Sequence, residues 1–91
     1  MVQVKKLMLD VLKPHTPSGL DFASALAEQG PDYRVTFTVQ EVDEKTETVI
    51  IIIEGQDIQF ERIVETISEQ GASLHSIDQV EVVSGNPSHG Q

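Results

Sequence analysis

The sequence predicts an α+β fold in which a four-stranded antiparallel sheet carries two helices on one face. Two observations indicate this class. Residues 33–55 have the pattern of a β-hairpin, in which an alternating arm and a wholly aliphatic arm flank an acidic turn. Segments with the apolar spacing of helices lie on both sides of this hairpin, each between it and a further strand-like segment. The predicted order is therefore strand, helix, strand, strand, helix, strand.

The chain before the hairpin supplies the first strand and the first helix. A strand is expected over residues 2–13, which have apolar side chains on both sides. Pro14 ends it, because proline lacks the backbone donor that a strand ladder needs. Ser18 is a helix N-cap candidate and predicts a helix over residues 18–29, which Gly30 ends.

The hairpin and the chain after it supply the remaining elements. The run of aliphatic residues at 49–53 is typical of an interior strand with apolar neighbours on both faces. A second helix is expected over residues 57–70, with Asp57 as its N-cap candidate. The last strand, residues 73–83, has an apolar spacing that slips from odd to even positions, which predicts a β-bulge.

This element order is that of a ferredoxin-like βαββαβ sandwich, whose usual topology places the first and third strands at the sheet centre. Those are the two strands with apolar residues on both sides. We expect one domain over residues 1–83 and a flexible C-terminal tail over residues 84–91. The expected core shared by helices and sheet contains Phe22, Leu26, Phe37, Phe60, Ile63 and Ile67.

Composition excludes several classes of function. The chain has 91 residues and a formal net charge of −9, from fifteen acidic and six basic residues. Such an anionic surface repels phosphate backbones and acidic lipids, so neither nucleic acid nor membrane is an expected partner. The absence of cysteine excludes thiolate metal sites and cysteine nucleophiles. With no segment of signal-peptide or membrane-spanning type, a cytoplasmic protein is expected.

Three segments, residues 9–17, 39–63 and 71–80, resemble a small, mainly archaeal family catalogued as domain of unknown function 211. The most specific pieces are Lys13-Pro14-His15, the turn at 43–47, Gly55 with Asp57, and His75-Ser76-Ile77-Asp78. The resemblance implies the ferredoxin-like fold, ring-shaped homo-oligomers, and bound metal ions in some members. It implies no assigned activity.

Acidic and histidine residues should gather at one edge of the predicted sheet, where the first strand ends, the hairpin turns and the last strand begins. Carboxylate oxygens favour hard cations such as calcium or magnesium, whereas imidazole moves the preference towards zinc, nickel or manganese. Because oxygens outnumber imidazoles here, calcium or magnesium is favoured over zinc. The predicted metal ligands are Asp10, His15, Asp43, Glu47, His75 and Asp78.

Each of these residues also has an ordinary structural explanation. The acids of the turn can hydrogen-bond their own backbone. His15 follows a proline at a strand end, where an exposed histidine is common. Asp10 lies within a central strand, where a carboxylate needs a partner, and either Lys6 or Arg34 could supply the charge.

Enzymatic readings have little support. Ser73, His75 and Asp78 are crowded on one short strand, where a two-residue period cannot form a catalytic relay. We therefore expect a non-enzymatic homo-oligomer that binds divalent cations at an acidic sheet edge or subunit interface. Met8, Leu12, Val42 and alternate residues of 49–53 should form an uncovered apolar face that favours assembly. The alternative is a regulatory module that binds an effector of amino-acid type at a subunit interface.

Overall fold

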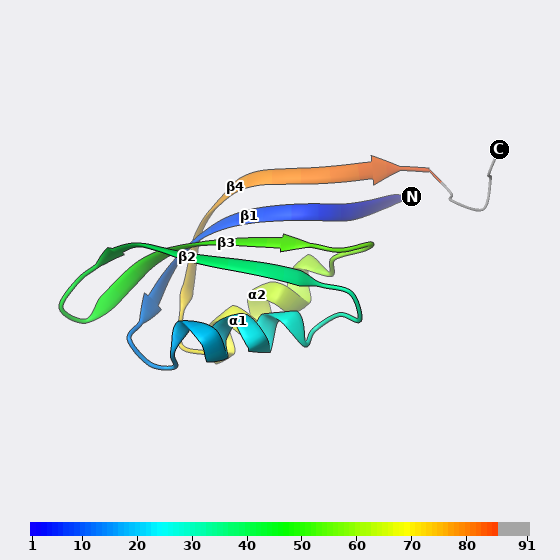
Figure 1. Ribbon diagram of the computed structural model, residues 1–91. Helices are drawn as coiled ribbons and strands as arrows, with labels where there is room; N and C mark the ends of the chain where they lie inside the picture. The colour runs from blue at the N-terminus through cyan, green and yellow to red at the C-terminus, as the bar shows by residue number, and fades with distance from the viewer. Residues whose placement is uncertain (86–91) are drawn as a thin grey trace.

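The computed structural model describes residues 1–85, in which the chain forms a sheet and two helices (Figure 1). The elements are β1 (Val2–Pro14), α1 (Gly19–Ala27), β2 (Arg34–Val42), β3 (Thr46–Glu54), α2 (Phe60–Glu69) and β4 (Ser73–Ser84). The strands form one antiparallel sheet in the order β2-β3-β1-β4. The predicted ferredoxin-like fold, with the first and third strands central, is confirmed. Most of the predicted tail lies outside the described residues.

The alternation of β1 and β3 divides the sheet into a face covered by the helices and an open face. On the covered face the cross-strand pairs of these two strands are apolar and buried: Leu7 with Ile53, Leu9 with Ile51, and Val11 with Val49. Each fully buried aliphatic side chain of this size contributes about 1.5–3 kcal/mol. The helices complete the core with Phe22, Leu26, Ile63 and Ile67.

Two residues expected in the core lie at its margin. Phe37 and Phe60 are only partly buried and pack against the core from outside. Phe37 is on the edge strand β2, and Phe60 is the first residue of α2, so neither is enclosed on all sides. The expected contact of both residues with the core is present, but they lie at its margin and not among its fully buried residues.

The two helices begin in different ways. Ser18 caps α1 as predicted, and its Oγ accepts a hydrogen bond of 3.1 Å from the backbone nitrogen of Asp21. The N-cap of α2 is Gln59, not Asp57, and it makes no side-chain capping bond. The helix starts late because Ile58 is buried and its backbone nitrogen donates to the carbonyl of Val4, 2.8 Å away. No helix within residues 1–85 is long and apolar enough to cross a membrane.

The predicted irregularity of β4 is confirmed. The register of β4 against β1 shifts between Met8 and Leu9 and again between Asp10 and Val11, and a third shift lies nearer the start of β1. At the first two shifts, Asp78 and His75 have no partner in β1. Bulges of this kind redirect side chains, so alternation alone cannot assign His75 or Asp78 to a face.

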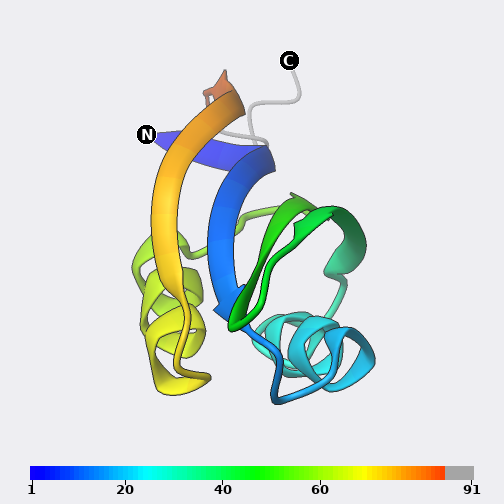
Figure 2. The same ribbon diagram turned by 90° about the vertical axis from the view of Figure 1, so that its left-hand side faces the viewer.

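The outer part of the sheet is long and only partly covered: Val4 packs against the core, and the segment after β3 hydrogen-bonds to the backbone of Val4 and Lys5. Residues 2–6 of β1 and 80–84 of β4, here called the arm, lie away from both helices in both views (Figures 1 and 2). Beyond Lys6, where the pairing of β1 with β3 ends, the arm is a two-stranded ribbon of β1 and β4. The radius of gyration is 14.0 Å and the longest extent is 54 Å, whereas a compact domain of 100 residues has a radius of about 13 Å. The molecule is therefore elongated along the arm.

Candidate functional site

A charged cluster lies where β1 ends beside the turn of the β2–β3 hairpin. Lys13 lies opposite Glu47 in the register of β1 and β3. Lys13 continues the odd positions of β1, whose side chains face the helices. The strand pairing therefore places an amine and a carboxylate together at the end of the core.

Lys13 is fully buried, which sequence reasoning did not anticipate. Its Nζ donates to the carbonyl of Pro14 at 2.8 Å and lies 3.6 Å from Oε1 of Glu47. It is also 6.0 Å from the ring centroid of Phe22, within the range of a cation–π contact. A buried ammonium is tolerated only when it is paired and hydrogen-bonded in this way.

His15 joins the segment after β1 to the hairpin turn. Its Nδ1 lies 3.2 Å from Oε2 of Glu47, and its Nε2 lies 3.0 Å from the carbonyl oxygens of both Asp43 and Glu44. The side-chain hydrogen bond to Glu47 is the main cause that raises the pKa of His15 above its usual 6.5, and the bond to the Glu44 carbonyl adds to it. The site therefore favours the imidazolium form, in which both nitrogens donate.

The acids of the turn have the local roles that turn chemistry predicts. Oδ1 of Asp43 accepts from the backbone nitrogen of Glu44 at 3.1 Å, and the backbone nitrogen of Asp43 donates to the carbonyl of Thr46 at 2.7 Å. Glu47 has a lysine on one carboxylate oxygen and a histidine on the other. A divalent cation at Glu47 would have to compete with both.

The six predicted ligands divide between separate places. His15, Asp43 and Glu47 lie in the charged cluster, whereas Asp10 is on the open face and His75 and Asp78 are on β4. Within residues 1–85, no three His, Asp or Glu side chains are grouped in a way that could hold a metal ion. Metal binding by these residues therefore stays a prediction.

Asp10 lies in an apolar part of the open face. Its register partners are Ile50 on β3 and Ser76 on β4, and it is half-buried. Neither of its expected partners, Lys6 or Arg34, forms an ion pair with it in the described part of the chain; both lie opposite Glu54. Uncovered or half-covered apolar side chains flank this carboxylate in β1 and β3: Met8, Leu12, Ile50 and Ile52.

Asp78 interacts with Ser76, the residue of β4 that pairs with Asp10. The hydroxyl of Ser76, directly across the sheet from Asp10, donates to Oδ1 of Asp78 at 2.7 Å. Asp78 thus accepts from a neighbouring serine, whereas a catalytic relay would require it to hold His75. Asp10 on β1 and Ser76 and Asp78 on β4 carry hard oxygen donors.

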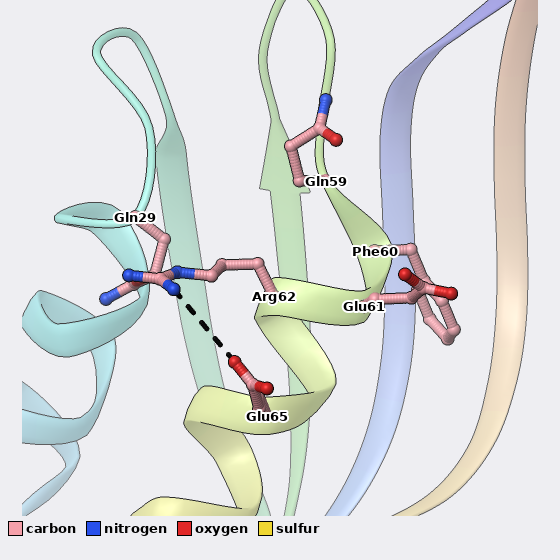
Figure 3. A pocket seen from close by; sticks show the side chains of 6 residues that line it. All are labelled: Gln29, Gln59, Phe60, Glu61, Arg62 and Glu65. Atoms are coloured by element: carbon pink, nitrogen blue, oxygen red, sulfur yellow. Dashed lines mark hydrogen bonds and ion pairs between the residues drawn. The ribbon is translucent and has the colours of Figure 1, made fainter.

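An open groove of about 860 Å³ lies where α2 begins beside the end of α1 (Figure 3). Nε of Arg62 donates to Oε1 of Gln29 at 2.8 Å and bridges the two sides. A guanidinium nitrogen of Arg62 lies 4.0 Å from Glu65. The remaining lining residues are Gln59, Phe60 and Glu61. Both signs of charge are present, but the guanidinium already has partners within the chain.

Comparison with known proteins identifies the family of this chain. The model of domain of unknown function 211, described as "Uncharacterized ArCR", matches residues 5–87. An uncharacterised protein of Methanocaldococcus jannaschii is 42% identical over 77 residues, which cover 85% of this chain and 79% of that protein. The chain belongs to the family of domain of unknown function 211.

Proposed function

We propose that this protein is a non-enzymatic homo-oligomer whose subunits associate through the arm and the open face, with divalent cations neutralising carboxylates between them. The observation that carries the proposal is the exposure of the arm's valines: Val2, Val80, Val82 and Val83 are between 43% and 59% exposed. An isolated two-stranded ribbon is only marginally stable in water. A surface that covers these valines would therefore stabilise the arm.

A second copy of the chain is the partner that fits this surface. The arm carries exposed valines interspersed with polar residues such as Lys5 and Glu81, and no helix covers it in either view, so its partner should offer an apolar strand surface to the valines. Every copy presents such a surface, and a symmetric contact matches it with itself. The outer edge of β4 adds unpaired backbone groups, which favour strand pairing. We expect a closed assembly, and the family resemblance favours a ring.

The cation part of the proposal concerns Asp10 and Asp78. Covering the open face with another subunit would remove water from the Asp10 carboxylate, at a high cost unless a cation neutralises it. One chain supplies few ligands at this position, so a complete site would draw on two subunits. Oxygen donors favour calcium or magnesium over zinc.

Sedimentation equilibrium at micromolar concentration tests the assembly. The parent should sediment well above the monomer mass of 10.0 kDa, and Val82→Lys should shift it towards that mass because a lysine on the arm opposes apolar packing and strand pairing. Leu20→Lys is the matched control, since Leu20 is exposed on α1, away from the arm. A parent that sediments at the monomer mass rules out self-association.

Chelation tests the cation separately. At matched ionic strength, excess chelator should lower the melting temperature and restored calcium should raise it, by an amount that depends on free calcium relative to its Kd. Asp10→Asn should abolish this response, whereas Glu69→Gln, which removes one charge from an exposed position on α2, should keep it. Identical melting and mass with chelator and with calcium would exclude the cation.

The second candidate is the regulatory effector module, and the groove between the helices favours it. A zwitterionic amino acid could place its carboxylate near Arg62 and its ammonium near Glu61 or Glu65. A rise in melting temperature with amino acids but not with calcium would support this function over the first. Arg62→Gln should then abolish that rise.

A further inference from the structure

A row of four charged side chains crosses the open face of the sheet, one from each strand. Glu54 on β3 lies opposite Arg34 on β2 and opposite Lys6 on β1. Lys6 also lies opposite Glu81 on β4. Cross-strand partners point to the same face, and Lys6 is on the open face because Leu7, beside it, is buried in the core. From β2 to β4 the charges in this row, here called the charge row, alternate as positive, negative, positive, negative.

The charges of this row remain available to a partner. Within residues 1–85, none of the four forms an ion pair, although each has an opposite charge beside it in the register. Lys6 and Glu54 are partly buried, whereas Arg34 and Glu81 are exposed. A surface that covers the row should offer the reverse order of charges, because like charges placed opposite one another oppose association.

A second copy of the chain carries this reverse order. Two open faces can pack about a two-fold axis that runs parallel to the strands, between β1 and β3, and lies midway between the two sheets. This rotation reverses the order of the strands and keeps each row level with itself, so Lys6 meets the partner's Glu54 and Arg34 meets the partner's Glu81. All four contacts then join opposite charges. An axis that crosses the strands at this row would instead place each charge opposite its own copy.

The row next to the charge row also matches its own copy. From β2 to β4 it contains Thr36, Ile52, Met8 and Gln79. The same rotation places Ile52 opposite the partner's Met8, and Thr36 opposite the partner's Gln79, so apolar side chains meet apolar ones and polar meet polar. In the following row, Asp10 meets no opposite charge and lies near its own copy across the axis, which is where the proposed function places a cation.

We propose that the open faces of two subunits pack together in this two-fold arrangement and that the charge row determines their alignment. This inference rests on the proposed function, because it names the contact by which two copies associate. Sheets packed face to face lie about 10 Å apart, a distance that a lysine and a glutamate pointing at each other can bridge. Such sheets cross at about 30°, so the two pairs formed by Lys6 and Glu54, closest to the axis, keep their alignment best.

Charge-reversal variants, purified separately and then mixed, test this contact. Lys6→Glu leaves only acidic side chains at the two central positions of the charge row, and Glu54→Lys leaves only basic ones. Each variant alone should therefore self-associate at least about tenfold more weakly than the parent in sedimentation equilibrium. An equimolar mixture should recover the parent mass, because all four pairs between unlike chains again join opposite charges. Mixing cannot repair a contact within one chain, so recovery identifies a contact between chains.

Lys45→Glu and Glu69→Lys are the matched controls. They make the same changes of charge at exposed positions in the hairpin turn and on α2, so they should keep the parent mass both alone and mixed. Arg34→Glu and Glu81→Arg provide a second test pair at exposed positions on the edge strands, where a change of charge does not disturb the core. Each of these should also weaken self-association alone and restore it when mixed.

The outcomes distinguish this contact from assembly itself. A parent that sediments at the monomer mass contradicts assembly, and with it this contact. A parent that assembles while Lys6→Glu and Glu54→Lys keep its mass overturns the two-fold arrangement but leaves assembly standing. The arrangement is also overturned if the two variants are folded by circular dichroism and dissociated, and their mixture stays dissociated.

Discussion

Replacing Lys13 with methionine should destabilise the fold by about 3 kcal/mol. Removing one member of a buried ion pair costs about 3–5 kcal/mol, because the other charge is left without compensation. The low end applies here, since Glu47 is 19% exposed and keeps His15 as a partner. Methionine fills the volume of the lysine stem beside Phe22, so no large cavity adds to the cost.

Thermal unfolding followed by circular dichroism measures this effect. A loss of about 3 kcal/mol corresponds to a fall in Tm of about 12–24 °C for a domain of this size. Protein concentration must be held fixed, because self-association would also raise Tm. Lys45→Met is the control, because Lys45 is exposed in the turn.

The double variant Lys13→Met with Glu47→Met distinguishes the charge from the packing. Replacing both members of a buried pair by apolar residues is often neutral or stabilising, so the double variant should recover most of the lost Tm. If the single variant Lys13→Met melts within about 4 °C of the parent, the loss is below about 1 kcal/mol. The burial argument for Lys13 is then refuted.

Three further substitutions test the fold. Phe60→Ala should lower the free energy of unfolding by about 2 kcal/mol. This is below the usual cost of about 3–5 kcal/mol for a buried phenylalanine, because the ring of Phe60 lies at the core margin. A urea midpoint equal to that of the parent would place Phe60 outside the core. Ser18→Ala should lower the free energy of unfolding by about 1 kcal/mol by removing the cap of α1, and no loss in urea unfolding would contradict this. Gly71→Ala should cost about 1 kcal/mol because φ is +84° there, so an unchanged Tm would argue against that conformation.

The fold was predictable because local patterns and topology rules agree. The first and third strands have apolar residues on both sides, and the ferredoxin-like topology places both of them in the interior of the sheet. The irregularity of β4 was visible in the sequence because its apolar residues change from odd to even positions. The start of α2 was not predictable from capping preferences alone. Asp57 is the better N-cap by residue type, but the burial of Ile58 and its backbone bond to β1 delay the helix.

The site was less predictable, because nearness at a sheet edge does not determine side-chain direction. Asp10 and Lys13 are three residues apart in β1, yet the two-residue period sends them to opposite faces. Lys13 could have been found by extending the odd positions Leu7, Leu9 and Val11 by one step. A lysine at the end of a buried row has to find a carboxylate, and Glu47 lies directly opposite it.

The carboxylates of this acidic chain differ in whether the chain itself supplies a cationic partner for them. Glu47 lies between two cationic side chains of its own chain, so nothing further is needed at the end of the core. Asp10 has no ion-pair partner within the described residues, although it is half-buried among apolar side chains. Water can solvate it only while the open face stays uncovered. Any surface that covers this face must therefore bring positive charge or hydrogen-bond donors to Asp10, and a cation between subunits would meet that need, which is why assembly and cation binding belong to one proposal.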